Sequence, residues 1–188
     1  RLSSRSVSVG ISTENLWWGP GFRNSLIMSN NAPGFLHGTF NSVKPLKTFL
    51  GSFEFQLIGG RLERSGIQPI SSDYVVSGVN YLEPKSTDAR YISALSINYQ
   101  PRWVPGLFLG FSRAFHLYTS DMGSGLTDVF PFILPFEKKN APLEDAKRRD
   151  QLASFSARWV FPASHLELYG EVGWNDYSTS FWDWFLSN

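Results

Sequence analysis

The chain has 188 residues, of which 42% are hydrophobic, 16% aromatic and 18% charged, with a formal net charge of +1. These values exclude global disorder and give no basic surface for nucleic acid, and the absence of cysteine excludes disulfides and thiolate metal sites. The longest apolar stretch, residues 129–136, is far shorter than the roughly 20 residues that a membrane-spanning helix needs.

Apolar and polar side chains alternate along most of the chain, beginning with Val7, Val9 and Ile11 among serines and a glycine. A period of two is typical of a β-strand with one apolar and one polar face. The same period runs from Phe49 to Leu57 and recurs further along the sequence. It predicts seven strands, near residues 5–13, 35–44, 48–61, 90–100, 107–118, 151–160 and 165–176.

The connections between these strands are of two kinds. Short turns with proline or glycine lie at 43–47, 101–106 and 161–164. Long loops cover 14–34, 63–89 and 119–150, so all short turns fall at one end of the sheet and all long loops at the other. We expect a small hairpin arm within residues 74–82, and about two turns of helix near residues 143–152.

Long strands joined by short turns at one end and long loops at the other indicate an outer-membrane β-barrel. A closed sheet pairs all its backbone groups within lipid, and rings such as Trp103 and Trp159 near strand ends suit the membrane interfaces. We therefore predict an all-β fold, an antiparallel up-and-down transmembrane β-barrel in the bacterial outer membrane. A soluble carbohydrate-binding β-sandwich has the same alternation and stays open as an alternative.

Seven is an odd number of strands, whereas single-chain bacterial barrels have an even number. We therefore expect residues 1–188 to form one barrel domain that is partial, an incomplete section of a larger barrel.

Two motifs near the start of the chain resemble the capsule assembly protein Wzi family of bacterial outer-membrane proteins. They are Glu14–Gly21 (ENLWWGPG) and Ser25–Phe35 (SLIMSNNAPGF), followed in the family's order by Gly60–Glu63, Leu168–Glu171 and Asn175–Asp176. The resemblance implies a barrel larger than this chain that attaches or organises capsular polysaccharide or exopolysaccharide at the cell surface, in a lectin-like role. The implied partners are that polysaccharide, outer-membrane lipid and other capsule-export proteins.

Sugars are bound by aromatic faces together with amides, carboxylates and guanidinium groups that hydrogen-bond to hydroxyls. Trp17, Trp18, Asn30 and Asn31 supply such groups from one loop, whose glycines and prolines allow it to fold into the lumen. The alternative is that the two tryptophans plug the barrel and hold this loop in place.

Charged residues on the predicted strands give a second set of candidates. We expect Glu54, Arg90 and Glu167 to face the lumen together with Arg61, Arg158 and Glu171, in a network of ion pairs or in contact with ligand. The candidate polysaccharide contacts on the wall are Arg61, Glu63, Arg158 and Glu171. Arg113 shares a face with Leu109 and Phe111, and the sequence leaves its direction open.

Nothing in the sequence favours catalysis, a cofactor or a metal. His37, His116 and His165 are isolated on different strands without a nucleophile motif or metal-ligand spacing. We expect a binding protein and not an enzyme. The main alternative function is an outer-membrane channel or transport barrel.

Overall fold

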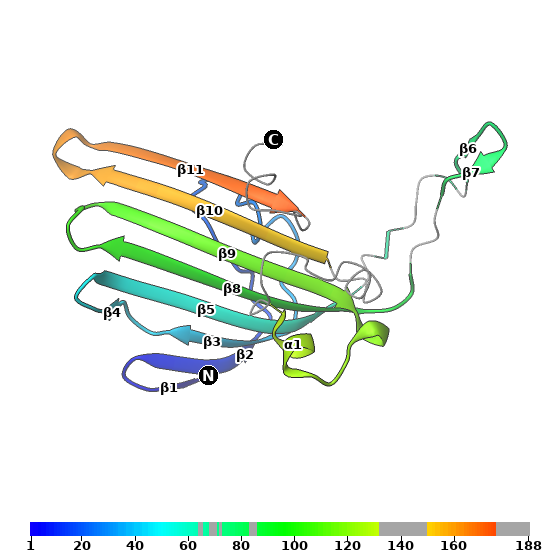
Figure 1. Ribbon diagram of the computed structural model, residues 1–188, viewed down its shortest axis with the longest axis horizontal. Helices are drawn as coiled ribbons and strands as arrows, with labels where there is room; N and C mark the ends of the chain where they lie inside the picture. The colour runs from blue at the N-terminus through cyan, green and yellow to red at the C-terminus, as the bar shows by residue number, and fades with distance from the viewer. Residues whose placement is uncertain (64–65, 68–70, 72, 83–85, 132–149, 176–188) are drawn as a thin grey trace.

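The computed structural model describes residues 1–63, 66–67, 71, 73–82, 86–131 and 150–175. They form one large antiparallel sheet of nine strands, and all seven predicted strands are present (Figure 1). The long strands are β2 (Val7–Ser12), β3 (His37–Ser42), β5 (Gly51–Leu62), β8 (Arg90–Pro101), β9 (Leu107–Tyr118), β10 (Asp150–Phe161) and β11 (Leu166–Asn175). The two short additional strands are β1 (Leu2–Ser3) and β4 (Leu46–Lys47).

The strands follow one another as an up-and-down meander in the order β1-β2-β3-β5-β8-β9-β10-β11, with β4 beside β5. Among the described residues, β1 and β11 have a neighbour on one side, so the sheet is open. This arrangement agrees with the predicted incomplete section of a barrel.

The two ends of the sheet differ as the sequence predicted. Figure 1 shows the tight turns after β1, β4, β8 and β10 at one end, which we call the short-turn end. The turn after β10 is the 3-10 helix η3 (Pro162–Ser164). The other end, the long-loop end, holds the 3-10 helix η1 (Thr119–Asp121), helix α1 (Leu126–Val129) and the predicted hairpin arm, strands β6 (Val75–Val76) and β7 (Val79–Asn80).

The predicted helix near residues 143–152 falls mostly outside the described residues. Its last three residues are not helical, because Asp150 to Leu152 begin β10 and pair with His116 to Ala114 of β9. The charge and alanine content that favour a helix locally are outweighed there by the continuing sheet ladder. No helix among the described residues is long and apolar enough to cross a membrane.

The register gives the sheet two chemically different faces. One row across five neighbouring strands consists of Phe55, Ile97, Phe111, Phe155 and Val172. These side chains belong to the apolar face. The side chain of Phe155 is 45% exposed and that of Val172 is 59% exposed. No second sheet of the described residues covers this face, so the architecture is not the β-sandwich that we considered.

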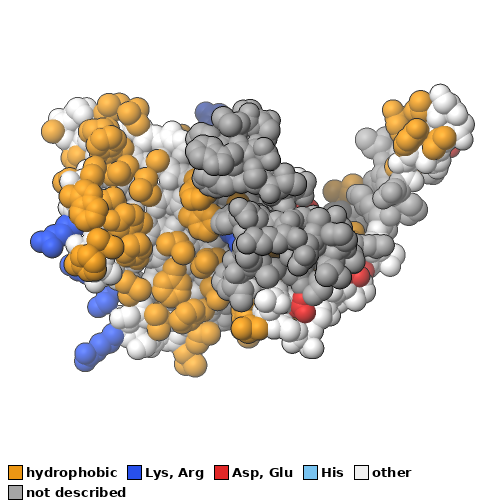
Figure 2. Space-filling view, viewed as in Figure 1, with side chains coloured by type: hydrophobic (Ala, Val, Ile, Leu, Met, Phe, Trp, Pro, Cys, Tyr) orange, Lys and Arg blue, Asp and Glu red, His pale blue; other side chains and the backbone are white. Residues whose placement is uncertain are grey.

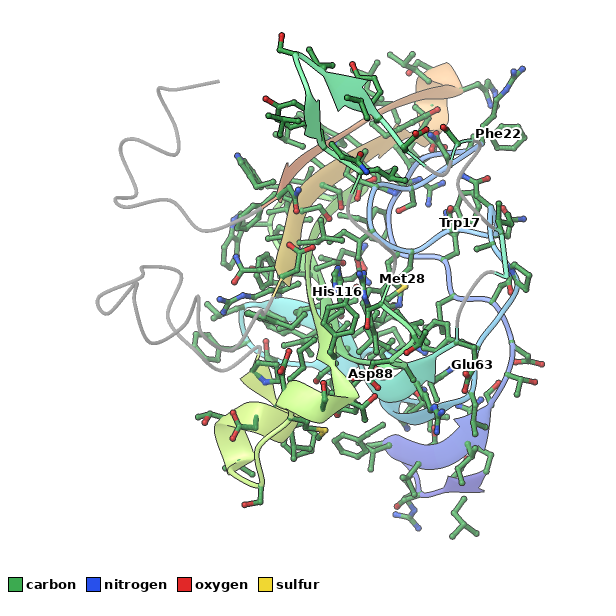
Figure 3. The ribbon with its side chains drawn as sticks, turned by 90° about the vertical axis from the view of Figure 1, so that its right-hand side faces the viewer. Trp17, Phe22, Met28, Glu63, Asp88 and His116 are labelled. Atoms are coloured by element: carbon green, nitrogen blue, oxygen red, sulfur yellow. The ribbon has the colours of Figure 1, made fainter. Side chains whose placement is uncertain are left out.

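The other face is polar, and its adjacent row consists of Glu54, Asn98, Gly110, Ser156 and Glu171. Residues 14–34, here called the inner loop, pack on this polar face. Figure 3 shows the inner loop, with Trp17 and Phe22, on the opposite side of the sheet from α1. The core formed by this contact consists of Trp18 and Met28 of the loop with Ile58, Ile92, Ala94 and Ala114 of the wall.

Candidate functional site

The inner loop is held on the polar face by Trp18. Its backbone N–H donates to the carbonyl of Met28 at 3.0 Å, and its indole Nε1–H donates to Oε1 of Gln56 on β5 at 2.7 Å. The side chain is only 4% exposed. Because the side chain is almost fully buried and hydrogen-bonded to the wall, the main role of Trp18 is to position the loop at the edge of the cavity that it borders.

Glu171 of β11 is the second anchor of the inner loop. Its Oε2 accepts a hydrogen bond from the backbone N–H of Leu26 at 3.2 Å and lies 3.5 Å from the hydroxyl of Ser25. The Ser25 hydroxyl also contacts the carbonyl oxygen of Trp18. Gly19 permits this close approach, since a Cβ there would lie 2.8 Å from Glu171 Oε2, and its φ of +139° suits glycine.

The wall beneath the inner loop is made of small side chains. The row that contains Gln56 continues through Ser96, Ser112 and Ser154 to Gly173. A Cβ at Gly173 would lie 2.9 Å from Leu26 Cδ1. Small residues in this row therefore leave the space that the loop occupies.

A cavity of about 960 Å³ opens beside the inner loop, toward the short-turn end of the polar face. Loop residues 17–22 form one side of it. The wall side presents Glu54, Asn98, Phe108, Ser156, Arg158, Glu167 and Tyr169. Trp17 is 38%, Phe22 84% and Tyr169 52% exposed, so aromatic surface is accessible at this site.

Arg158 and Glu167 form a two-point ion pair in the cavity wall. Nε and Nη2 of Arg158 donate to Oε1 and Oε2 of Glu167 at 2.8 and 3.0 Å. The guanidinium carbon also lies 5.9 Å from the centre of the Phe108 ring. The two parallel hydrogen bonds fix the plane of the guanidinium group. They also hold it beside the Phe108 ring before any ligand binds.

The structure brings together part of the predicted site. Trp17 and Arg158 line the cavity, while Trp18 and Glu171 hold the loop that forms its other side. Asn30 and Asn31 are exposed on the inner loop outside the cavity lining.

Arg61 and Glu63 form an exposed ion pair at the long-loop end, with Arg61 Nε 2.9 Å from Glu63 Oε1. Our expectation that Arg61 faces the lumen was wrong. Arg61 is in phase with Phe55 and Leu57 of the apolar face and opposes Tyr91. Arg61 lies next to the last residue of β5, where its side chain is exposed and paired with Glu63, so its charge is tolerated there.

Arg113, whose direction the sequence left open, lies on the apolar face and is 3% exposed. Its Nε and Nη2 donate to Oε1 of Gln151 at 3.1 and 2.5 Å, and it lies 4.6 Å from the centre of the Phe115 ring. Nearby, the hydroxyl of Tyr91 donates to the carbonyl of Val129 at 2.9 Å. The segment that contains α1 therefore covers part of this face at the long-loop end.

From the sequence we expected Glu54 and Glu167 only as lumenal charges, and we did not expect the cavity residues Asn98, Phe108, Ser156 and Tyr169. The available signal was the cross-strand register, which places Glu54 beside Asn98 and Phe108 beside Arg158. Among the described residues, no cluster of three or more histidine, aspartate or glutamate side chains is arranged to hold a metal ion.

The open antiparallel meander, with an apolar face on one side and a loop-filled polar face on the other, defines a section of an outer-membrane-type β-barrel. The family model described as capsule assembly protein Wzi matches residues 3–188. The chain belongs to this family, as its motifs indicated. No curated protein and no solved structure matched the chain.

Proposed function

We propose that this chain binds capsular polysaccharide or exopolysaccharide noncovalently in the cavity beside the inner loop. The observation that carries this proposal is the combination of accessible aromatic rings with fixed polar groups in one concave site. Trp17, Phe108 and Tyr169 offer ring faces for the C–H surfaces of sugars, and Glu54 and Asn98 offer hydrogen-bonding partners for hydroxyls. The volume lies within the range typical of ligand sites, about 300–1,000 Å³.

The proposed location is the bacterial outer membrane, with the apolar face toward lipid. Outward residues of β10 run from Ala153 to Phe161, which spans about 27 Å along the strand at ~3.4 Å per residue. With a tilt of about 40°, this corresponds to roughly 20 Å across the membrane, close to the apolar band of known barrels. Capsule-export proteins are further proposed partners, through the surfaces outside the cavity.

Asn30, Asn31, Arg61 and Glu63 remain candidates for contact with a different part of the polymer. A polysaccharide is longer than one cavity, and all four side chains are exposed at or near the long loops. In barrels of this type the long loops face the cell exterior.

The direct test is polysaccharide binding by the full-length protein in detergent, with Trp17→Ala and Phe108→Ala as the variants. We expect each to weaken binding about fivefold to a hundredfold, since stacking on an aromatic ring contributes roughly 1–3 kcal/mol by analogy with base stacking. Trp103→Ala is the matched control, because Trp103 is 64% exposed in the turn between β8 and β9 and away from the cavity. Unchanged binding in both cavity variants would exclude this site.

The transport alternative makes a different prediction. A channel needs a passage through the lumen, whereas the inner loop is anchored on the lumenal face at Gln56 and at Glu171. Steady ion conductance of the wild-type protein in a planar bilayer, without any effect of added polysaccharide, would favour the transport function over binding.

A further inference from the structure

The short-turn end of the sheet carries a row of cations, here called the basic rim: Arg5, Lys44, Lys47 and Arg102. Arg5 lies between β1 and β2, Lys44 and Lys47 between β3 and β5, and Arg102 between β8 and β9. All four side chains are exposed. Lysine and arginine side chains project from this end of the molecule in Figure 2.

The basic rim is not neutralised by neighbouring acids. The turn segments 2–7, 42–51, 101–107 and 161–166 contain no aspartate or glutamate. Within the described part of the chain, no ion pair joins a rim residue to a carboxylate. The nearest acids along these strands, Glu54 and Glu167, line the cavity on the polar face, and Glu167 is paired with Arg158. Lys47 opposes Ser52 and is therefore in phase with Glu54, but the described residues show no ion pair between them.

The opposite end of the sheet has a different balance of charge. The long-loop end carries acids as well as bases, including Glu63, Asp88, Arg90 and Asp121. Figure 2 shows acidic side chains on that side of the molecule and basic ones at the short-turn end. Among the described residues, bases without neighbouring acids are therefore found at the short-turn end, whereas the long-loop end carries both signs.

The basic rim lies at the edge of the apolar band. Val43, Phe49 and Trp103, in the same turns, are 46%, 79% and 64% exposed. Just inside them Phe53 and Tyr99 stack at 4.5 Å between ring centres, and the Tyr99 hydroxyl donates to the Leu50 carbonyl at 3.0 Å. Aromatic rings at a strand end mark the membrane interface, so cations in these turns lie at the depth of lipid headgroups.

The spacing of the rim residues suits a layer of headgroups. Neighbouring strands are about 4.8 Å apart, so adjacent hairpin turns are separated by roughly 10 Å. This separation is close to the Debye length of about 8 Å at physiological ionic strength, and the cations therefore act on the same layer. Lysine and arginine both form charge-assisted hydrogen bonds with phosphate oxygens.

We propose that the basic rim binds the phosphate groups of anionic phospholipids in the leaflet that surrounds the short-turn end. In outer-membrane barrels the short turns are periplasmic, so this is the phospholipid leaflet facing the periplasm. The inference depends on the barrel architecture and is independent of polysaccharide binding in the cavity. It assigns a lipid partner and an orientation to turns that have no part in the cavity.

The test uses the full-length protein folded into vesicles of equal parts phosphatidylglycerol and phosphatidylcholine. After mild solubilisation, native mass spectrometry gives the ratio of the two lipids that the protein retains. We expect enrichment of phosphatidylglycerol in the wild type and a loss of about fivefold for each cation removed in Arg5→Gln, Lys44→Gln, Lys47→Gln and Arg102→Gln, singly and combined. Higher salt should reduce the wild-type enrichment, because exposed charges are screened.

Two sets of variants keep this test decisive. Arg23→Gln with Arg90→Gln removes two cations away from the rim and should leave the lipid ratio unchanged. A combined Lys44→Arg and Lys47→Arg variant keeps the charge and should retain the enrichment, which separates loss of charge from misfolding. Equal lipid ratios in the wild type and the folded combined glutamine variant would overturn the proposal.

A different occupant gives a different result. If the combined glutamine variant keeps its lipid ratio but loses binding to polygalacturonate in detergent, the rim faces an acidic polymer and the lipid proposal is wrong. Trp17→Ala should keep the phosphatidylglycerol enrichment, and the combined rim variant should keep binding in the cavity. Failure of the lipid proposal is thus distinguishable from failure of the proposed polysaccharide function.

Discussion

Arg158 of β10 and Glu167 of β11 are joined by two parallel hydrogen bonds of 2.8 and 3.0 Å on the polar face, where both side chains line the cavity. The pair is solvent-accessible, with side-chain exposures of 46% and 38%. Exposed pairs contribute little to stability. In the proposed function, the pair instead presents a guanidinium and a carboxylate in a fixed geometry to the polysaccharide.

Arg158→Lys tests this geometry, because it keeps the positive charge and removes the planar two-point contact. We expect polysaccharide binding to weaken about threefold to tenfold, the equivalent of roughly one hydrogen bond. The thermal midpoint should change little. Isothermal titration calorimetry and thermal unfolding of the full-length protein measure the two effects. Equal affinity of the wild type and the variant would show that Arg158 does not contact the polysaccharide.

Trp18→Phe tests the anchor of the inner loop. The variant keeps a buried aromatic ring but loses the indole donor to Gln56, and it leaves the Gln56 oxygen without that partner. We expect loop opening to become easier by about 1 kcal/mol. Hydrogen exchange should then accelerate at the amides of residue 18 and Leu26 but not in β8 or β9, whereas Trp103→Phe should leave exchange in the loop unchanged.

Gly19→Ala should disturb the same loop for a steric reason. A Cβ at this position would lie 2.5 Å from Ser25 Oγ and 2.8 Å from Glu171 Oε2, and the φ of +139° is unfavourable for alanine. Backbone strain of this kind costs of order 1–3 kcal/mol. We expect faster hydrogen exchange at Leu26 and weaker polysaccharide binding.

Gly170→Ala is the matched control for Gly19→Ala. Gly170 lies on β11, next to Glu171, and a Cβ at this position would meet no atom within 4 Å. Binding and exchange should stay at wild-type values. If both alanine variants behave alike, close packing at Gly19 is not what holds the loop.

The strands could be predicted from the sequence because their signal is local. Alternation in phase with the pleat located all seven long strands, and the position of short turns located the two ends of the sheet. The same rule, followed strictly, also assigns Arg61 to the face of Phe55 and Leu57. Our wrong prediction for Arg61 came from assigning every charged side chain to the lumen. A charged side chain at the exposed end of a strand can lie on the outward face as well.

The candidate site could be predicted only in part because its contacts are remote in sequence. Trp17 and Trp18 are adjacent and chemically alike, yet only Trp18 donates a hydrogen bond to Gln56, which lies 38 positions away in the sequence. Trp18 is therefore a buried anchor, whereas Trp17 is 38% exposed. Glu171 acts on Leu26 across 145 positions. No pattern within a single segment contains these relationships, which depend on the register and on where the loop folds back.

The long loops have a contact that is sensitive to pH. The Asp88 carboxylate accepts a hydrogen bond from the backbone N–H of Ser120 at 2.9 Å, beside the hydrogen bond from Thr119 N–H to the Ala89 carbonyl at 3.0 Å. The contact with the Ser120 backbone is the main cause that holds the pKa of Asp88 below its usual value, and a side-chain hydrogen bond with Ser120 acts in the same direction. The charged form of Asp88 therefore favours the closed contact between the two segments.

The sign of the pH dependence follows from this lowered pKa. Stabilisation of the contact is complete above the ordinary aspartate pKa of about 3.9 and is lost as the pH falls through the lower, folded-state value. We expect hydrogen exchange at the Ser120 amide, corrected for the intrinsic effect of pH, to rise in that acidic range. In Asp88→Asn the corrected exchange rate should be higher than in the wild type at neutral pH and should not change with pH across the same range. If the wild-type rate also does not change with pH, the Asp88 carboxylate does not hold the contact with Ser120.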